Sequence, residues 1–331
     1  MTRRVAAVDC GTNSLRLLVA DVDLDRAELT DVTRRMEIVR LGQGVDQTGL
    51  LAPEALARTA NVLRDYADVI AATAARPVRM VATSATRDAS NTAEFIRQVK
   101  EILGVAPEVL TGSEEAMLSF TGATAELDGT HGGPFLVVDI GGGSTEFVLG
   151  FPRGDDLPQT PPDLGGPARP PKSPWARSVD IGCVRMTERH LHGDPPSRDE
   201  TAAATADVDA ALDTVIGAVP VRQARTLVGL AGSVTTVAGI AMGLPAYDPA
   251  RIHHARVSAA GVHEVARSLL AQTRAERAVI GVMHPGRVDV IGGGALILDR
   301  IMERFGCSEV LVSEHDILDG MAWSLAADAR H

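Results

Sequence analysis

The chain has 331 residues and a formal net charge of −11, and aromatic residues make up only 3% of it. This length exceeds one ordinary core and predicts two domains built mainly from small aliphatic residues. The negative charge argues against long nucleic acid as a partner, because binding to a phosphate backbone needs a basic surface. No apolar run reaches the roughly 20 residues that span a bilayer. Since no signal-peptide pattern opens the chain either, we expect a soluble, cytoplasmic protein that does not bind membranes.

The cysteines and histidines give no sign of a metal site. The three cysteines, Cys10, Cys183 and Cys307, are widely spaced with no C-x-x-C pair, which indicates neither a disulfide framework nor a zinc site. Cys10 and Cys183 fit small packing residues better than redox switches. The nine histidines show no metal-ligand spacing, and we expect His253 and His254 at the surface.

The first part of the chain predicts a layered α/β domain. Runs 4–21 and 32–41 look like strands, the first in two parts hinged at residues 11–13. The expected elements that follow are a helix over 53–75 opened by proline, a strand over 78–82, a helix over 92–103 closed by Gly104, a strand over 108–110, and a helix from Glu114 to about 127 capped by Ser113. Alternation of strands and helices is the signature of an α/β fold.

The second part of the chain repeats the opening of the first. Residues 138–144 repeat residues 8–14 as a Val-Asp-x-Gly turn between two apolar runs. The expected elements are a strand–turn–strand unit from Phe135, a strand over 226–230, and helices from Ser233, Val262 and Asp316. This repetition suggests duplicated domains around one ligand. We therefore predict an N-terminal domain over 1–130 and a C-terminal domain over 131–331, with the last helix able to pack back on the first domain.

One segment differs in composition from its surroundings. Residues 151–177 contain 8 of the 18 prolines and little apolar surface. Such a stretch cannot bury enough surface to offset the entropy of ordering it. We expect a flexible surface insertion, and a solvated segment without function is favoured over a binding loop.

The two repeated turns are the candidate phosphate-binding loops. Backbone N–H groups at such turns can point at an anion, and small hydroxylated side chains can add to them. A single Gly-rich turn is a weak signal because hairpins commonly contain one. As a pair they predict two cradles that face one ligand. The predicted phosphate-binding residues are Gly11, Thr12, Asn13 and Ser14 in the first turn and Gly141, Gly142, Gly143 and Ser144 in the second.

Carboxylates lie beside both turns. Asp9, Asp139 and Glu146 would repel a phosphate unless a divalent cation lay between them. Oxygen ligands suit Mg²⁺, which takes one or two carboxylates together with substrate phosphates. We therefore predict Mg²⁺, or another divalent cation, held by these three residues. The alternative is that the aspartates only cap the turns through hydrogen bonds to the backbone.

A series of motifs resembles one known family. In chain order the motifs cover residues 9–14, 83–91, 112–116, 139–146, 182–185, 231–236, 287–291 and 294–296. Together they look like the successive signatures of the exopolyphosphatase and guanosine pentaphosphate phosphohydrolase family. The resemblance spans nearly the whole chain. It implies two duplicated α/β domains of the actin-like, ribonuclease-H-like fold, with an active-site cleft between them.

The resemblance also points to a catalytic carboxylate. Glu114 and Glu115 open a helix, where the helix dipole favours negative charge, and capping explains only one of them. By resemblance Glu115 is the catalytic residue, which activates a water for in-line attack on the terminal phosphorus. Glu146 is the second candidate and either orients that water or binds the metal. Which of the two glutamates takes the proton stays open.

Basic residues resolve the conflict between an acidic chain and an anionic ligand. Arg87 follows a strand end in a Thr-Ser-Ala turn, where its guanidinium can grip phosphate oxygens. Arg16 occupies the position that Glu146 holds in the repeat, and packing between domains and binding of substrate charge both stay open for it. Gly232 and Ser233 are further phosphate-binding candidates, although the family commonly has threonine where this chain has Ser233.

By resemblance, the chain releases terminal phosphate from inorganic polyphosphate. The alternative is hydrolysis of guanosine pentaphosphate to the tetraphosphate. The chain ends at His331 without the C-terminal helical domains of longer members, which favours shorter polyphosphate or nucleotide. A homodimer is expected from the resemblance alone. Two other classes stay open: an actin-like ATPase or sugar kinase that uses residues 229–233 as an adenosine-binding turn, and a non-catalytic filament or phosphate sensor.

Overall fold

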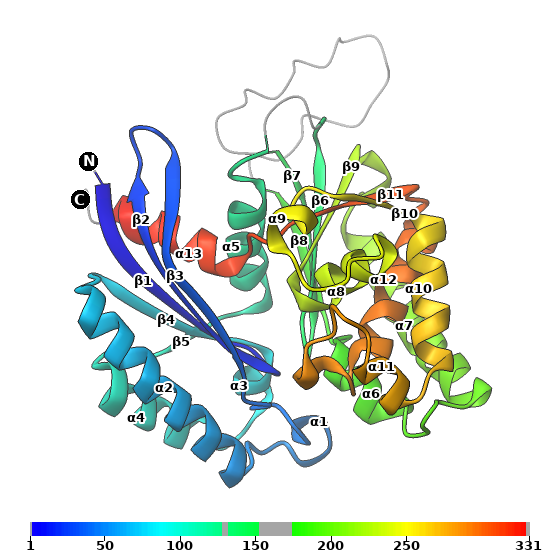
Figure 1. Ribbon diagram of the computed structural model, residues 1–331, viewed down its shortest axis with the longest axis horizontal. Coiled ribbons are helices and arrows are strands. Elements are labelled where there is room, and N and C mark those ends of the chain that lie inside the picture. The colour runs from blue at the N-terminus through cyan, green and yellow to red at the C-terminus, as the bar shows by residue number, and fades with distance from the viewer. Residues whose placement is uncertain (1, 128–131, 152–173, 329–331) are drawn as a thin grey trace.

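The computed structural model describes residues 2–127, 132–151 and 174–328, and its core consists of two β-sheets with helices on both faces (Figure 1). Most of the Pro-rich segment, residues 152–173, lies outside the described residues, as does the predicted domain boundary near residue 130. The division into two domains at that boundary stays a prediction. None of the described helices is long and apolar enough to cross a membrane.

The elements before residue 128 include the five strands of the first sheet. They are β1 (Thr2–Cys10), β2 (Ser14–Asp23), β3 (Glu28–Ile38), α1 (Val45–Thr48), α2 (Pro53–Thr73), β4 (Val78–Ala82), α3 (Ser84–Asp88), α4 (Thr92–Leu103), β5 (Glu108–Val109) and α5 (Gly112–Thr124).

The elements after residue 131 include the six strands of the second sheet. They are β6 (Phe135–Ile140), β7 (Thr145–Gly150), β8 (Trp175–Val179), α6 (Cys183–His190), α7 (Arg198–Ala218), β9 (Thr226–Leu230), α8 (Ala231–Ala241), α9 (Pro249–Ile252), β10 (Arg256–Ser258), α10 (Ala259–Ala271), α11 (Arg274–Ala278), α12 (Ile291–Phe305), β11 (Glu309–Val312) and α13 (Ile317–Asp328).

The two sheets have the same topology. The first has the order β3-β2-β1-β4-β5, and the second has the order β8-β7-β6-β9-β11 with β10 added at one edge. In the first sheet β1, β2 and β3 form an antiparallel series and β4 runs parallel to β1. In the second sheet β6, β7 and β8 form the same series and β9 runs parallel to β6. This confirms the expected duplicated α/β fold. The strand registers also match, because Asp9 lies opposite Arg16 and Asp139 lies opposite Glu146.

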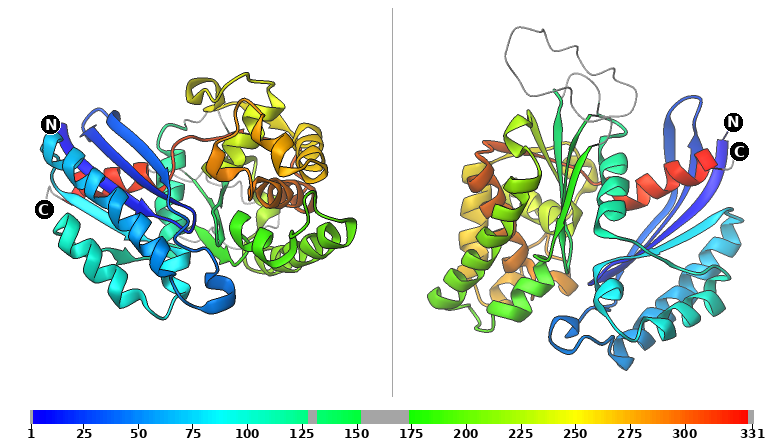
Figure 2. Two further views of the ribbon diagram at one scale, coloured as in Figure 1. Left: turned by 60° about the horizontal axis from the view of Figure 1, so that its bottom comes forward. Right: turned by 180° about the vertical axis from the view of Figure 1, so that it is seen from behind.

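Each sheet is covered by helices on both faces (Figure 2). Helices α2 and α4 pack on one face of the first sheet, and α13 covers the other face with Leu318 and Met321. Helices α7, α8, α10 and α12 cover one face of the second sheet, whereas α5 covers the opposite face with Ala116 and Phe120. The last helix therefore packs against the first sheet.

Helices α5 and α13 cross between the sheets with their backbones in contact. A Cβ atom on Gly122 would lie 1.8 Å from the carbonyl oxygen of Asp316, and a Cβ atom on Gly320 would lie 2.0 Å from the carbonyl oxygen of Leu118. Only glycine permits so close an approach. The crossing thus joins the helix that covers the second sheet to the helix that covers the first.

Two helix starts differ from the prediction. Helix α5 begins at Gly112, and Thr111 caps it through a reciprocal capping box with Glu114, so the predicted cap Ser113 is wrong. Thr111 is the better cap because it places a glutamate three residues later. Helix α8 begins at Ala231, which has a left-handed φ of 72°, two residues before the predicted start.

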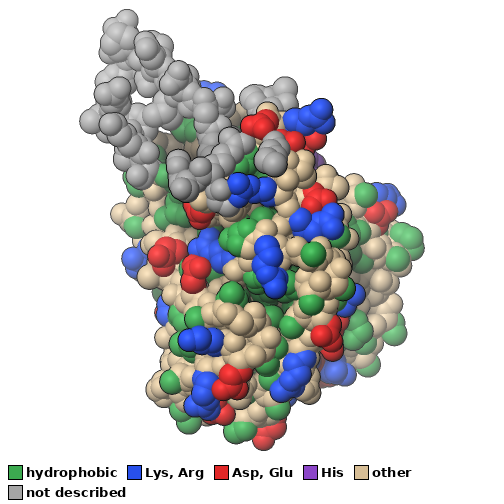
Figure 3. All heavy atoms as spheres, turned by 90° about the vertical axis from the view of Figure 1, so that its left-hand side faces the viewer, with side chains coloured by type: hydrophobic (Ala, Val, Ile, Leu, Met, Phe, Trp, Pro, Cys, Tyr) green, Lys and Arg blue, Asp and Glu red, His purple; other side chains and the backbone are tan. Residues whose placement is uncertain are grey.

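The side of the molecule on which the first sheet lies carries charges of both signs. Figure 3 shows basic and acidic side chains interspersed there among hydrophobic ones. Strands of the first sheet carry ion pairs of this kind, including Arg4 with Asp21 and Arg79 with Glu108.

Candidate active site

A cavity of about 90 Å³ lies where the Gly-rich turns of the two sheets meet. Most of the sequence-predicted site residues line it. They are Asp9, Gly11, Thr12, Asn13, Ser14, Glu115, Asp139, Gly141, Gly142, Gly143, Ser144, Gly232 and Ser233. Arg87 and Glu146 do not belong to the lining, although both lie near Glu115. The space is large enough for several water molecules.

The backbone carbonyl groups of the first turn accept hydrogen bonds from the segment that follows β3. The carbonyl oxygen of Asn13 accepts hydrogen bonds from the N–H groups of Val39 and Arg40, at 3.1 and 2.9 Å. The carbonyl oxygen of Thr12 accepts one from Gly42 at 2.8 Å. In a trans peptide the C=O and the next N–H point in opposite directions. The N–H groups of Asn13 and Ser14 are therefore turned away from these donors.

The backbone carbonyl groups of the second turn accept hydrogen bonds from the N-terminal residues of α6. The carbonyl oxygens of Gly141 and Gly142 accept from the N–H groups of Cys183 and Val184, both at 2.9 Å. The carbonyl oxygen of Gly143 accepts from Nε of Arg185 at 2.7 Å. Three successive peptide groups thus direct their N–H ends away from α6. Such a row of N–H groups is a typical anion-binding nest.

The two turns approach each other so closely that their glycines are required. A Cβ atom on Gly142 would lie 2.8 Å from Cβ of Thr12, and one on Gly143 would lie 2.4 Å from Oγ of Ser84. Thr12, Ser84 and the second turn therefore form one continuous wall. The turns face the same small space, as the duplicated sequence predicts.

Asp9 is buried at the end of β1 and is only partly neutralised. Its Oδ2 accepts from Nε and Nη2 of Arg16 at 3.0 and 2.6 Å, whereas its Oδ1 is buried and has no hydrogen-bond partner. Burial raises the pKa of the Asp9 carboxyl in spite of the guanidinium. A buried carboxylate oxygen without a partner costs free energy and leaves a site for a proton, a water or a cation.

Asp139 and Glu146 repeat this situation on the second sheet. Oδ2 of Asp139 accepts from Oγ of Ser119 at 2.7 Å, and burial raises its pKa to about 6. Oε1 of Glu146 accepts from Oγ of Ser178 at 2.7 Å, whereas its Oε2 is buried without a partner. Burial, followed by the charge of Asp139, raises the pKa of Glu146 to about 8.

The two adjacent glutamates of α5 have separate roles. Glu114 accepts a hydrogen bond from the N–H of Thr111 at 2.8 Å and so caps the helix. Glu115 is buried and lines the cavity, and burial together with the charges of Glu146 and Asp139 raises its pKa well above its ordinary value. Nη1 of Arg87 lies 3.3 Å from Oε2 of Glu115 and 2.8 Å from the carbonyl oxygen of Leu110. Arg87 is therefore paired with the candidate catalytic carboxylate.

The carboxylates fit a hard divalent cation. Two of the three predicted ligands carry a buried oxygen without a partner, and repulsion among the carboxylates is part of why their pKa values are raised. Ligand atoms of Asp9, Asp139 and Glu146 are not all within 4.8 Å of one another, since the only such group of three among the described residues is Glu126, His253 and His315. Mg²⁺ needs only one or two direct carboxylates and completes its shell with water and phosphate oxygens.

The Glu126, His253 and His315 group fits a hydrogen-bond cluster better than a metal site. Nδ1 of His253 accepts the N–H of Glu314 at 3.1 Å, so the proton of the neutral ring is on Nε2, which lies 3.4 Å from Oε2 of Glu126. A nitrogen that carries a proton cannot bind a metal. His253 and His254 were expected at the surface, and both are partly exposed, with stacked rings whose centroids lie 3.8 Å apart.

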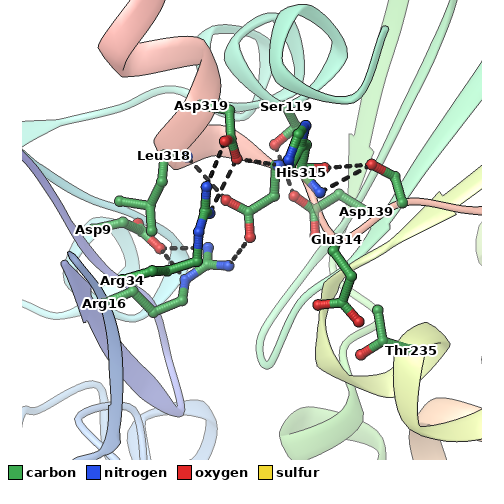
Figure 4. Close-up of polar contacts among 12 residues, drawn as sticks. Asp9, Arg16, Arg34, Ser119, Asp139, Thr235, Glu314, His315, Leu318 and Asp319 are labelled. Carbon is green, nitrogen blue, oxygen red and sulfur yellow. Dashed lines mark hydrogen bonds and ion pairs between the residues drawn. The ribbon is translucent and has the colours of Figure 1, made fainter. Parts of the chain in front are cut away.

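Arg16 joins the first sheet to the chain that leads into α13 (Figure 4). Besides Asp9, its guanidinium binds Asp316. Arg34 of β3 similarly binds the buried Asp319 at 2.6 Å, and the N–H of Asp316 donates to Asp319 at 2.8 Å. Arg16 thus joins the start of α13 to the first sheet, and it also lines the cavity.

Several site residues were not assigned a role from the sequence. Ser119 and Ser178 hold the two carboxylates, and Arg185 and Arg287 come from the 182–185 and 287–291 motifs. The motif resemblance could have found the arginines. Nothing in the sequence marks the serines, because their partners come from other elements.

Comparison with known proteins is consistent with this geometry. Residues 18–328 match the model of the Ppx/GppA phosphatase family. The chain belongs to this family. It is 50% identical over 334 residues to exopolyphosphatase 2 of Mycobacterium tuberculosis (strain CDC 1551 / Oshkosh), covering 98% of each chain. It also resembles the crystal structure of an exopolyphosphatase-like protein, with a TM-score of 0.88, 40% identity and coverage of 98% and 99%.

A more distant relative has a different substrate in its name. The guanosine-5'-triphosphate,3'-diphosphate pyrophosphatase of Aeromonas salmonicida is 28% identical over 320 residues, which cover 97% of this chain and 59% of that protein.

Proposed function

We propose that the chain is an exopolyphosphatase that hydrolyses the terminal phosphoanhydride bond of inorganic polyphosphate and releases orthophosphate. The observation that carries the proposal is the pair of inward-turned backbone loops with the buried Glu115 beside them. Its support also includes family membership and the 50% identity to a protein named exopolyphosphatase.

The proposed mechanism assigns one task to each group. The N–H groups of both turns bind the terminal phosphate and stabilise the charge that builds up on its oxygens. Glu115 accepts a proton from the attacking water, for which a raised pKa is suitable because it matches the base to neutral pH. Arg87 orients Glu115 and can move to the phosphate once the ligand is bound.

We propose that Asp9, Asp139 and Glu146 hold Mg²⁺ in this site. The ion would supply positive charge to the phosphate oxygens and so offset the repulsion between substrate and carboxylates. Glu146 can orient the water if it is not a direct ligand. Ser119 and Ser178 fix the two carboxylates of the second sheet in place.

Guanosine pentaphosphate is the second candidate substrate, and one feature favours it. A second cavity of about 530 Å³ adjoins the first and shares Arg16, Ala231, Gly232 and Arg287 with it. Apolar and aromatic side chains such as Tyr247 and Met283 contribute to its walls. A nucleoside could lie there while its phosphates reach the Gly-rich turns.

A phosphate-release panel with Mg²⁺ tests the proposal. The substrates are polyphosphates of several lengths, guanosine pentaphosphate and ATP. We expect polyphosphate to be the best substrate and Glu115→Gln to abolish release. Preference for guanosine pentaphosphate would establish the alternative. Turnover of ATP alone, and only with a phosphoryl acceptor, would refute a hydrolase and indicate a kinase.

A further inference from the structure

Each sheet, together with the helices that pack on it, is called one half of the molecule. Arg185 on α6 contacts both halves. Its Nε donates to the carbonyl oxygen of Gly143 in the second turn at 2.7 Å. The same guanidinium forms ion pairs with Asp46 of α1 and Asp88 of α3, and its Nη2 lies 3.4 Å from Oγ of Ser84. The Arg185 side chain is only 12% exposed. One side chain thus joins the second phosphate loop to two elements packed beside the first sheet.

The contact with Gly143 differs from the others that hold this loop. The carbonyl oxygens of Gly141 and Gly142 are bound by backbone N–H groups of α6, a helix whose Met186 belongs to the core of the second sheet. The carbonyl oxygen of Gly143 instead accepts its hydrogen bond from the side chain of Arg185. The other partners of Arg185, Asp46 and Asp88, come from the first half. If the halves separate, Arg185 loses these partners and the peptide between Gly143 and Ser144 is no longer fixed.

We propose that Arg185 is a positioning residue that couples closure of the cleft to the shape of the second phosphate loop. In the closed arrangement, Asp46 and Asp88 hold the guanidinium against Gly143, so that the N–H of Ser144 points toward the anion. By linkage, whatever stabilises closure must tighten phosphate binding, and bound phosphate must favour closure equally. The inference rests on the proposed function only in taking phosphate as the ligand.

The charges of Asp46 and Asp88 make the proposal distinguishable from simple electrostatics. Neither residue lines the cavity, and both are negative. Removing a negative charge near an anion site should tighten binding through Coulomb's law. The proposed coupling requires the opposite, because Asp46→Asn or Asp88→Asn releases Arg185 from the first half.

The chain offers a matched control on the same helix. Arg189 also pairs with Asp46, at 3.1 Å, but its other partner is Asp207 and it makes no contact with Gly143. Arg189→Gln removes an ion pair across the cleft without touching the loop. Asp207→Asn removes a negative charge without affecting Arg185.

The test measures tripolyphosphate affinity by calorimetry in a Glu115→Gln background, which keeps the ligand intact. We expect Arg185→Gln to weaken binding at least tenfold, Asp88→Asn to weaken it about threefold, and Arg185→Lys to recover part of the loss. Arg189→Gln removes only a partly exposed ion pair across the cleft, so it should weaken binding by about twofold at most, and Asp207→Asn should leave binding unchanged. Spin labels at the exposed positions Glu101→Cys and Ala202→Cys, with Cys307→Ser, should report a longer distance between the halves in Arg185→Gln.

Tighter binding by Asp88→Asn, or a loss of affinity in Arg189→Gln equal to that in Arg185→Gln, would overturn the coupling. A chain that binds tripolyphosphate in this Arg185-dependent way without hydrolysing it would refute only the proposed function.

Discussion

Glu114 and Glu115 are neighbours in sequence but face different surroundings. Glu114 lies at the helix start with its carboxylate on the N–H of Thr111, whereas Glu115 is buried in the cavity beside Arg87. We predict that Glu115→Gln lowers kcat by about 10²–10⁴-fold, since removal of a general base costs that much. The affinity for tripolyphosphate should change little. Steady-state phosphate release and calorimetry measure the two effects.

The matched control for this prediction is Glu114→Gln. It weakens the capping box, which costs on the order of 1 kcal/mol of stability, but it leaves the cavity unchanged. We expect kcat within threefold of the parent. Comparable loss of kcat in both variants would mean that the start of α5, and not the Glu115 carboxylate, is what catalysis requires.

At the residue scale, the sequence identifies loop residues better than their partners. The turns are continuous in sequence, so their glycines and hydroxyl residues can be predicted from one segment. Ser178 and Ser119 contact Glu146 and Asp139 across 32 and 20 positions of the chain. Only the folded arrangement brings such pairs together, and a single serine carries no pattern that distinguishes it.

Among the elements, the crossing of α5 and α13 has the least tolerance for change. The nearest atom to a Cβ at Gly122 is a backbone oxygen of Asp316 at 1.8 Å, which cannot swing aside as a side chain can. We predict that Gly122→Ala lowers the free energy of unfolding by about 1–3 kcal/mol, as overpacking does. Urea unfolding followed by circular dichroism measures this change.

Gly217→Ala is the control for the crossing. Gly217 lies in α7, and a Cβ there would meet nothing within 4 Å. In an open helical position, replacing glycine by alanine stabilises by up to about 1 kcal/mol. The two substitutions should therefore change stability in opposite directions. If Gly122→Ala is neutral, the helices can separate at little cost and the crossing does not hold the halves together.

The cluster of Glu126, His253 and His315 links the end of α5 to the chains around α9 and α13. The hydrogen bond from His253 is the largest influence on Glu126 and lowers the pKa of its carboxyl. A lowered pKa contributes stability above the unfolded-state value of about 4.5, and that contribution is lost as the pH falls through the folded-state value. Because Glu126 is half exposed, the contribution should be only about 0.5 kcal/mol.

Glu126→Gln should therefore be less stable than the parent at pH 6 and equally stable near pH 3. Urea unfolding at both values tests this dependence. A difference that persists unchanged at low pH would show that packing of the Glu126 side chain, and not its charge, stabilises this junction.

Element boundaries were predictable where local signals decide them. Residues 78–82, 92–103 and 226–230 form β4, α4 and β9 as predicted, because each has turn or capping residues at its ends. Helices α7 and α12 were not predicted. The first is rich in Ala, Thr and Asp, and the second has three consecutive glycines after its first residue. Packing on the second sheet determines α12, because glycine disfavours a helix. Helix α7 has local signals that the prediction did not use, namely its alanines and the capping box between Ser197 and Glu200.

At the scale of the whole molecule, the net charge of −11 is opposed by basic groups in the cleft. Arg16, Arg87 and Arg185 each bind a carboxylate of the protein. The repeated turns could be predicted to face one ligand because duplication implies it. The packing of the last helix on the first domain was also predicted, but its crossing with α5 was not, because that crossing depends on contacts between elements about 200 residues apart.

We predict that the buried carboxylates make stability dependent on metal, and this prediction concerns the whole molecule because Asp9 and Asp139 come from different sheets. At pH 8 without metal, their repulsion and burial oppose folding, so Asp139→Asn should raise the melting temperature. Mg²⁺ should stabilise the parent, since a concentration 100-fold above Kd adds about 2.7 kcal/mol. Asp139→Asn should lose most of this response, whereas the exposed Asp65→Asn should keep it. Thermal unfolding with Mg²⁺ and with EDTA measures both effects. If the melting temperature of the parent does not change with Mg²⁺, or if that of Asp139→Asn still responds fully, then these carboxylates do not hold a cation.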